Sequence, residues 1–291
     1  MIVPLAAASA VDNAARLVAQ RMADNMRGAI AVENVPGAAG LIGTERIAKS
    51  APDGYTIAGF NDSIMTMLPN MHAKMPWDIQ KDFDPVSLVA TVEWGLVAAN
   101  GAPYANAGEL IAAARAAPGR INYSSGGNGS PQHIAMELFA STAGISLTHV
   151  PYKGATQAAL DVAAGQVPVG FQGLATVASL ARGGKLRLIG VATPARHPQF
   201  ADVPTVSESG LPGFEFNSWF AIMVPAGTPK DIVVRLHAEV VKALGDADVR
   251  EKLNAQGLTP RGSTPEELRK ATAEQLAKYA RLMKQAGIKA D

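Results

Sequence analysis

Small hydrogen-bond donors crowd one segment of the chain, Ser124 to His133, which reads SSGGNGSPQH. The segment follows a β-rich run at Ile121 to Tyr123 and precedes a helical pattern of apolar residues. Ser130 is the expected N-cap of that helix, and Pro131 suits its first position. Free backbone N–H groups and the helix dipole favour negative charge at such a helix end. The loop could therefore bind an anion.

Two further loops are built from small residues, Ala6 to Ala10 and Pro36 to Gly40. Each lies between an expected strand and an expected helix, at the strand ends where open α/β sheets bind ligands. Tight turns explain any one such loop equally well. Three of them together favour a site, in which a cleft between two lobes holds an anion from both sides.

Enzyme and metal motifs are missing from these loops. No Gly-Lys-Ser/Thr follows a glycine-rich turn, and residues 37–43 lack the Gly-x-Gly-x-x-Gly order, which disfavours nucleotide binding. The Gly-x-Ser-x-Gly nucleophile pattern is absent, so a serine-dependent hydrolase stays an unsupported alternative. The five histidines show no metal-ligand spacing. We expect neither a metal nor a cofactor.

Single residues near the loops allow two interpretations each. His133 lies in the first turn after the serine-rich loop, where a ligand contact and a half-buried structural role are equally open. Asp12 lies near the start of the first expected helix, where its carboxylate suits the dipole or could receive a ligand's hydroxyl or ammonium group. Trp219, beside an expected crossover between lobes, could stack on a ring or pack in the core.

The composition narrows the class of partner. The 291 residues, of which 48% are hydrophobic, can form one large α/β unit or two compact lobes. A net charge of +1 without a basic stripe argues against nucleic acid and against an anionic membrane surface. The absence of cysteine excludes disulfides, thiolate catalysis and cysteine-ligated metals. Met1 to Leu5 reads as a strand and not as the start of a secretory leader.

The elements that position these loops follow an alternating rhythm. The first half begins with a βαβαβ pattern, which predicts a parallel sheet flanked by helices. Crossovers near residues 100 and 220 suggest two lobes joined by a two-segment hinge, and Thr264 to Glu267 reads as a capping box. We expect strands at 2–5, 29–33, 55–60, 86–99, 121–123, 147–150, 167–171, 186–191 and 216–224, and helices at 12–26, 41–49, 107–116, after 130, and at 156–164, 230–243, 247–256 and 264–286.

Over essentially its whole length the chain resembles the tripartite tricarboxylate transporter receptors, also called the Bug family of solute-binding proteins. The resemblance rests on an ordered set of motifs: VPLAAASAVDNAAR, ENVPGAAGLIG, APDGYT, DFDPVSLVA, YSSGGNGSPQH, HVPYKGA, GGKLRLIGVAT, DVPTVSESGLPGFE and SWFAIMVPAGTP. It implies an α/β, type II periplasmic binding protein fold without catalysis, in which two lobes close like a Venus flytrap about a two-segment hinge. Lobe 1 would comprise residues 1–100 and 222–291, whose last helix could also contact lobe 2, and lobe 2 would comprise residues 101–221.

The resemblance also implies the ligand-binding residues. In that family, main-chain amides and ordered water of the first two loops hold one carboxylate group, and the serine-rich loop of the second lobe helps recognise the rest. At the matching positions, lobe 1 supplies Ala7, Ala8, Ser9, Val11, Asp12, Ala38, Ala39 and Ser63, and lobe 2 supplies Ser125, Asn128, Ser130, His133, Gln172 and Gly173.

Two departures from the family pattern change the expectation. The family usually has Pro-Gly-Gly and a threonine where this chain has Ala7 to Ser9 and Val11, so methyl groups enter tight backbone positions and reshape the loop. Gln172 and Gly173 stand where the family often has an Asp-Asn pair, which removes a partner for a substrate ammonium group. We therefore expect a mono- or dicarboxylate with an apolar or aromatic body, held without a salt bridge.

The function that the resemblance implies is that of an extracytoplasmic receptor. It would bind a small-molecule carboxylate in the interlobe cleft, close by hinge motion, and deliver the ligand to the membrane components of a tripartite tricarboxylate transporter. We expect a periplasmic monomer. The alternatives are the serine-dependent hydrolase, on a similar two-lobed scaffold, and a sensor whose ligand-driven closure engages a signalling partner.

Overall fold

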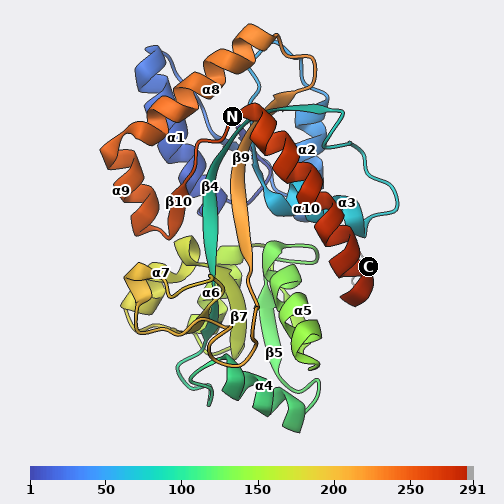
Figure 1. Cartoon of the computed structure of the whole chain (residues 1–291), viewed down its shortest axis with the longest axis vertical. Helices are drawn as coiled ribbons and strands as arrows, with labels where there is room; N and C mark the ends of the chain where they lie inside the picture. The colour runs from blue at the N-terminus through green and yellow to red at the C-terminus, as the bar shows by residue number, and fades with distance from the viewer. Residues whose placement is uncertain (287–291) are drawn as a thin grey trace. The chain divides into compact units, whose positions relative to one another are not determined.

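The computed structural model describes residues 1–286, which form two compact units (Figure 1). Unit 1 comprises Met1–Thr91 and the chain from Trp219 onward, and unit 2 comprises Val92–Ser218. The chain passes from unit 1 to unit 2 within strand β4 (Phe83–Ala98) and returns within strand β9 (Asn217–Pro225). The lobe boundaries expected near residues 100 and 221 stay a prediction about which parts move together.

Unit 1 contains a mixed sheet. Strands β1 (Ile2–Val3), β2 (Glu33–Asn34) and β3 (Ala58–Asn61) are parallel, as the βαβαβ pattern predicts. Strand β9 pairs antiparallel with β3, and the order across the unit is β2-β1-β3-β9-β4, with β10 (Leu258–Pro260) beside β4. The predicted parallel pairing of these three strands is confirmed, and the chain returning from unit 2 adds β9 beside β3 in the opposite direction.

The helices of unit 1 pack against one another in two groups. Helix α1 packs against α8 and α9, and α10 packs against η2 and α3. The predicted capping box is confirmed, since Thr264 N donates to Glu267 Oε2 at 2.8 Å and Glu267 N donates to Thr264 Oγ1 at 3.2 Å. The helices are α1 (Ala10–Met26), the 3₁₀ turn η1 (Ala38–Gly40), α2 (Leu41–Ala48), the π-helical turn η2 (Ser63–Met67), α3 (Leu68–Met71), α8 (Lys230–Gly245), α9 (Ala247–Ala255) and α10 (Pro265–Ala286).

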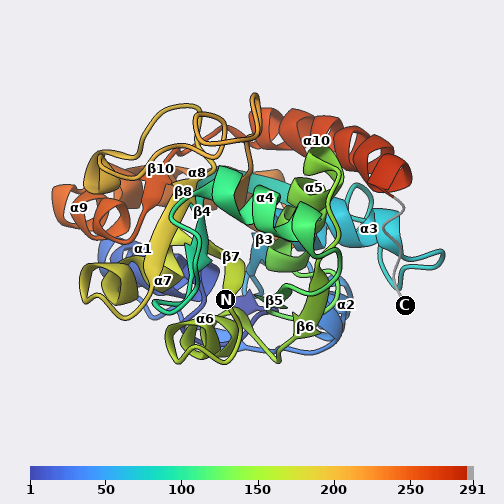
Figure 2. The same cartoon turned by 90° about the horizontal axis from the view of Figure 1, so that it is seen from below.

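Unit 2 is a second α/β layer structure. Its strand order is β8-β4-β7-β5-β6, in which β5 is parallel to β6 and β7, whereas β7 and β8 are antiparallel to β4. Helices α5 and α6 pack on opposite faces of β5 and β7 (Figure 2), as right-handed crossovers require when the chain steps out to β6 and back to β7. The elements are α4 (Ala107–Ala116), β5 (Asn122–Ser125), α5 (Pro131–Ala143), β6 (Thr148–Pro151), α6 (Ala155–Ala163), β7 (Val169–Gly173), α7 (Leu174–Arg182), β8 (Arg187–Val191) and η3 (Pro198–Phe200).

Several expected boundaries were wrong, and two shifts move candidate site residues. Strand β5 runs on through Ser125, and β7 runs on through Gln172 and Gly173, so these residues end strands instead of following them. Helix α7 was not predicted. Six of its nine residues are Leu, Ala or Arg, but a helix this short is marginal by itself and depends on packing. Strand β2 begins only at Glu33, the last residue of the predicted strand 29–33, and Glu33 pairs with Ile2 of β1.

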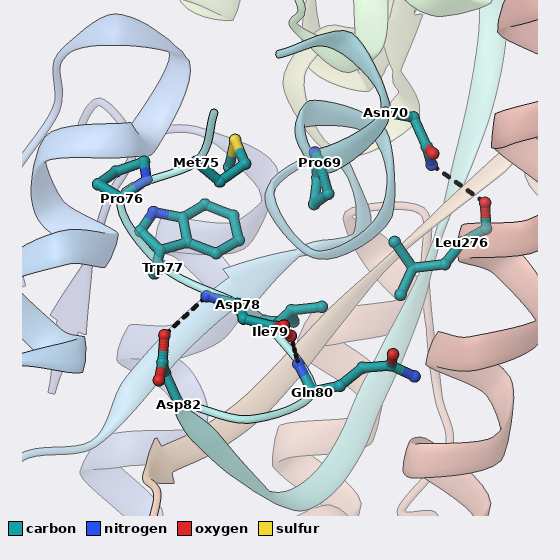
Figure 3. A pocket seen from close by; sticks show the side chains of 10 residues that line it. All are labelled: Pro69, Asn70, Met75, Pro76, Trp77, Asp78, Ile79, Gln80, Asp82 and Leu276. Atoms are coloured by element: carbon teal, nitrogen blue, oxygen red, sulfur yellow. Dashed lines mark hydrogen bonds between the residues drawn. The ribbon is translucent and has the colours of Figure 1, made fainter. Parts of the chain in front are cut away.

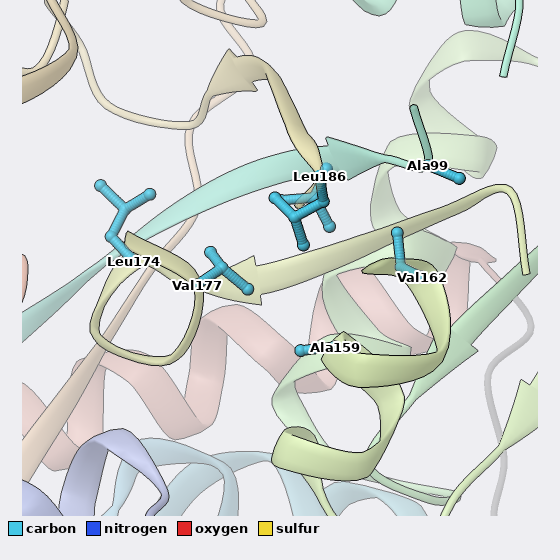
Figure 4. Close-up of a cluster of buried hydrophobic side chains, with 7 residues drawn as sticks. Ala99, Ala159, Val162, Leu174, Val177 and Leu186 are labelled. Carbon is cyan, nitrogen blue, oxygen red and sulfur yellow. The ribbon is translucent and has the colours of Figure 1, made fainter. Parts of the chain in front are cut away.

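A cluster of small and branched apolar residues holds α6 and α7 against β4 (Figure 4). Its members come from α7 itself and from segments before and after it, so the packing of α7 depends on side chains that are distant in the sequence. Fully buried aliphatic side chains of this kind carry most of the stability of a unit this size. The cluster consists of Val97, Ala99, Ala159, Val162, Leu174, Val177 and Leu186.

We expect Leu174→Ala to destabilise the protein by about 2–5 kcal/mol, because Leu174 is 0% exposed and its loss leaves a cavity in this cluster. Leu160→Ala is the matched control, since Leu160 lies on the neighbouring helix α6 and is 46% exposed. It should change the free energy of unfolding by less than about 0.5 kcal/mol. Urea unfolding followed by circular dichroism measures both. Equal losses in the two variants would contradict this assignment of the core.

Candidate functional site

The first loop of unit 1, between β1 and α1, turns on a left-handed alanine. Ala8 has a φ of 60°, and its amide N donates to Asp12 Oδ2 at 2.8 Å. Ser9 is the N-cap of α1, and its Oγ accepts from Asp12 N at 3.2 Å. Helix α1 therefore begins at Ala10, two residues before the expected start. The methyl group of Ala8 does occupy a tight position of this loop, as predicted from its departure from the family pattern.

Asp12 is the centre of the contacts that hold this loop. Its side chain accepts from Arg16 Nε at 3.1 Å and from Asn34 Nδ2 at 2.9 Å, in addition to Ala8 N, and Arg16 Nη2 lies 3.0 Å from Oδ1. Burial, with only 2% of the residue exposed, raises the pKa of Asp12, but the hydrogen bonds from Arg16, Asn34 and Ala8 outweigh it and lower that pKa. Both carboxylate oxygens are thus occupied by protein groups, which gives Asp12 a structural role in this state.

Asn34 ties the first loop to the second. Its Nδ2 donates to Leu5 O at 3.1 Å as well as to Asp12, and its Oδ1 accepts from Arg16 Nη2 at 2.8 Å. Asn34 ends β2, two residues before the second loop begins at Pro36. Asn34 and Arg16 were not among the predicted site residues, although Asn34 lies within the ENVPG motif and Arg16 lies one helical turn after Asp12.

The second loop has an unusual backbone. Four consecutive residues have positive φ: Gly37 at 137°, Ala38 at 45°, Ala39 at 55° and Gly40 at 107°. A Cβ on Gly40 would lie 2.7 Å from Ile64 Cδ1, so glycine is required there. The two alanines carry a steric cost of about 1 kcal/mol each. Left-handed residues at such a cost are typical of a segment whose backbone is shaped for function.

Backbone donors are available in both loops. Within residues 1–286, the amides of Ala10, Val11, Ala38 and Ala39 donate to no protein acceptor. Ala10 and Val11 are the first two residues of α1, whose N–H groups have no partner inside a helix, and the helix dipole adds positive potential there. The two loops therefore present the backbone donors that an anion requires, and the nearby cation Arg16 is paired with Asp12.

Ser63 reaches the same edge of the unit 1 sheet. It follows β3, is buried, and is the first residue of η2. The turn is fixed by Asn61, whose Oδ1 accepts from Ile64 N at 3.0 Å. Because β1, β2 and β3 are parallel, their carboxyl ends place the first loop, the second loop and Ser63 along one edge. The predicted residues of unit 1 are thereby brought to one side of the sheet.

The serine-rich loop of unit 2, Gly126 to Ser130, is also fixed by side chains. The predicted helix start is confirmed, because Ser130 is the N-cap, its Oγ accepts from His133 N at 3.3 Å, and Pro131 follows at the first helical position. Gly129 N donates to His133 Nδ1 at 3.2 Å. Asn128 lies exposed on the loop. Ser130 and His133 thus shape the loop from its helical side.

Ser125, at the end of β5, shapes the loop from its strand side. Its Oγ lies 3.1 Å from Gly127 N, 3.2 Å from Gly127 O and 2.5 Å from His149 Nε2. No sequence motif pairs Ser125 with His149, which lies 24 residues away on β6. Parallel pairing of β5 with β6 brings the two side chains together.

Gln172 and Gly173 end β7 beside the same loop. Gln172 is 0% exposed, and its Oε1 lies 3.5 Å from Gln132 Nε2 at the start of α5. Gln172 Nε2 has no hydrogen-bond partner among the residues that the structure describes. Gly173 caps α7. This end of the sheet therefore carries a neutral carboxamide where the family often has a carboxylate.

An open pocket of about 600 Å³ lies elsewhere in unit 1, between the segment around Trp77 and helix α10 (Figure 3). Trp77 packs edge-on against Phe83, with ring centroids 6.3 Å apart, which fits the core role expected of tryptophan. The predicted site residues are not part of its lining, which consists of Pro69, Asn70, Met75, Pro76, Trp77, Asp78, Ile79, Gln80, Asp82 and Leu276.

The described part of the chain, residues 1–286, contains no group of three or more histidine or acidic side chains arranged to hold a metal ion. Over the same residues, every helix is too short or too polar to cross a bilayer.

We expect Asp12→Asn to destabilise the protein at pH 7 by about 2 kcal/mol, because it breaks a buried charge-assisted network. The folded state lowers the pKa of Asp12, so its carboxylate stabilises the fold above about pH 4, and this contribution is lost as the pH falls through the folded-state pKa. The stability gap to the parent should therefore close in acid. Urea unfolding from pH 7 to pH 3 measures it, with the exposed Asp24→Asn on the same helix as control. A gap independent of pH would refute this role.

Comparison with known proteins places this geometry in a family. The family model described as tripartite tricarboxylate transporter family receptor matches residues 14–288. A solved structure from R. palustris, Rpa4515 with adipate, is 31% identical, covers 99% of this chain and 97% of its own, and superposes with a TM-score of 0.95. The periplasmic binding protein BugD is 29% identical over 100% of this chain and 98% of its own, with a TM-score of 0.94.

A third structure, MatC from Rhodopseudomonas palustris with bound malate, is 29% identical, covers 97% of both chains and has a TM-score of 0.91. The predicted periplasmic binding protein fold is thus confirmed. These proteins are binding receptors, which overturns the hydrolase alternative. With a family model that matches nearly its whole length, this chain belongs to the tripartite tricarboxylate transporter receptors, the family that includes the Bug proteins.

Proposed function

We propose that this receptor binds a small organic carboxylate in the periplasm and delivers it to the membrane components of a tripartite tricarboxylate transporter. The observation that carries the proposal is the set of four free amides at Ala10, Val11, Ala38 and Ala39. Adipate and malate, the ligands of two relatives, are both carboxylates. Backbone donors at a helix end are a common way to bind such a group.

In this proposal, unit 1 holds one carboxylate group of the ligand. The donors come from the first and second loops, and Ala7, Ala8, Ser9 and Ser63 complete the wall. Asp12 takes part through the loop that it holds, since its own oxygens already accept three hydrogen bonds and form an ion pair with Arg16. Arg16 is paired with Asp12, so the ligand's charge is met by dipoles and not by a salt bridge.

Unit 2 recognises the remainder of the ligand. The contributing residues are Ser125, Asn128, Ser130, His133, Gln172 and Gly173. The carboxamide of Gln172 is uncharged, so this wall supplies no counter-charge for a ligand ammonium group at that position. A mono- or dicarboxylate with an apolar or aromatic body fits this chemistry better than an acidic amino acid does.

Ligand binding would then change the populations of an open and a closed form, which gives the transporter two conformations to distinguish. Strands β4 and β9, which continue from one unit into the other, are the segments we assign to the hinge. The signalling-sensor alternative requires the same closure and differs only in its partner.

The proposal predicts that a carboxylate stabilises the purified protein. Ligand-stripped protein is screened by thermal shift against dicarboxylates that include adipate and malate, aromatic carboxylates, aspartate, glutamate and uncharged amides. A ligand at about 100 times its Kd should add about 2.7 kcal/mol of stability, and calorimetry then gives its affinity. Tight binding of aspartate or glutamate would contradict the assigned ligand class. If none of the acids raised the melting temperature, the proposal would be refuted.

We further expect Ala10→Pro to weaken carboxylate binding about tenfold or more, because it removes one donor to a charged group. The substitution suits the fold, since proline is favoured at the first helical position and Ser9 already has the extended φ of −71° and ψ of 162° that a residue before proline adopts. Ala247→Pro is the matched control, at the first position of α9 after Asp246 with φ of −71° and ψ of 131°. Calorimetry should show unchanged affinity for the control. Unchanged affinity in both variants would remove Ala10 from the site.

A further inference from the structure

His149 lies next to the proposed ligand loop of unit 2, yet no motif assigned it a role. In the β5–β6 pair, Tyr123 is directly opposite His149, and Ser125 is two residues further along β5. Opposite residues of a parallel pair and residues two apart on a strand share one face of the sheet. Tyr123, Ser125 and His149 therefore face the same side, where helix α5 packs on β5.

Three rings form a continuous stack on that face. The ring of His149 lies 4.9 Å from that of Tyr123 at an interplanar angle of 17°, and 4.2 Å from that of His133 at 12°. Helix α5 fixes both ends, because Glu137, one turn after His133, accepts from Tyr123 Oη at 2.5 Å. Tyr123 itself is fully buried. The imidazole of His149 is thus held between two anchored rings.

The contacts of Ser125 Oγ determine which nitrogen of His149 carries a proton. A serine hydroxyl donates one hydrogen bond and accepts two. Gly127 N can only donate to it and Gly127 O can only accept from it. The remaining contact, with His149 Nε2, is then satisfied when His149 donates. All three contacts of the hydroxyl are consistent with this single arrangement, which also leaves Ser125 no proton to give to a histidine base.

The two histidines thereby fix the backbone of the loop from two sides. His149 acts on Gly127 through Ser125, and His133 Nδ1 accepts from Gly129 N at 3.2 Å. Both glycines have positive φ, 116° and 75°. A loop of this composition has many accessible conformations, so side-chain contacts at two of its residues strongly restrict it.

We propose that His149 is a positioning residue of the ligand-binding loop: its Nε2–H donates to Ser125 Oγ, and its ring, stacked between Tyr123 and His133, holds that donor in place. The effect on ligand affinity rests on the proposed function, whereas the protonation pattern does not. Loss of the donor should therefore release Gly127 and weaken binding, although His149 itself touches no ligand.

The protonation pattern is tested without ligand. Two-bond ¹H–¹⁵N spectra of the ¹⁵N-labelled protein near pH 7.5 report the tautomer of each imidazole, and His149→Gln identifies the signals of His149. We expect protons on Nε2 of His149 and, because its Nδ1 accepts from Gly129, on Nε2 of His133. Ser125→Ala should shift the Nε2 signal of His149. A proton on Nδ1 of neutral His149 would overturn the proposal.

Two substitutions separate the hydrogen bond from the ring stack. His149→Phe keeps a ring and removes the donor, whereas His149→Gln keeps an N–H donor and removes the ring. With adipate as the probe, calorimetry should show about a fivefold or larger loss of affinity for the phenylalanine variant, from one lost hydrogen bond. The glutamine variant should recover at least part of that loss. His197→Gln, a histidine at η3 outside the stack, controls for the substitution and should bind as the parent does.

Equal affinity losses in the phenylalanine and glutamine variants would show that the imidazole acts only by packing, and would overturn the positioning role. If adipate does not bind the parent, malate serves as the second probe. Should neither bind, the result counts against the proposed function, and the tautomer of His149 in the ligand-free spectra still decides the present inference.

Discussion

The proposed ligand-binding part of unit 1 depends on one buried carboxylate. Asp12 accepts hydrogen bonds from Ala8, Arg16 and Asn34, and thereby fixes the first loop, the start of α1 and the residue that leads into the second loop. A buried charge of this kind is tolerated only because every lone pair has a donor. The negative charge of Asp12 is balanced by these donors within the protein. The backbone amides of Ala10, Val11, Ala38 and Ala39 do not take part in this network and are the donors that we propose for the ligand.

This arrangement shows how the proposed carboxylate site can be built from loops of alanine and glycine. In that proposal, small side chains would let the amides of Ala10, Val11, Ala38 and Ala39 approach a ligand closely, and the dipole of α1 would replace a cation. The second loop has this conformation at a steric cost, because Ala38 and Ala39 have positive φ. The parallel strands β1 to β3 supply the rigid edge on which such a strained turn can persist.

In unit 2, serine and histidine side chains fix the conformation of the small-residue loop. Its glycine-rich loop would have many conformations alone, but Ser125 and His133 contact Gly127 and Gly129, and the stack behind them rests on buried Tyr123. In both units, then, a polar side chain that lies behind the loop orders the backbone that we propose to face the ligand. Asp12 in unit 1 has the same role as these side chains in unit 2. In each case the polar side chain hydrogen-bonds to the protein and holds the backbone of a loop in position.

The sequence by itself determined the class of fold, the caps at Ser130 and Thr264, and the small-residue loops, because caps, periodicity and turn composition are local properties. The ordered motifs also determined the family. Only the tertiary structure decided that Asn34 and Arg16 converge on Asp12, that β9 runs antiparallel beside β3, and that His149 meets Ser125. These contacts join residues brought together by helical phase, strand pairing and the return of the chain, and propensities that act over a few residues carry no information about such pairings.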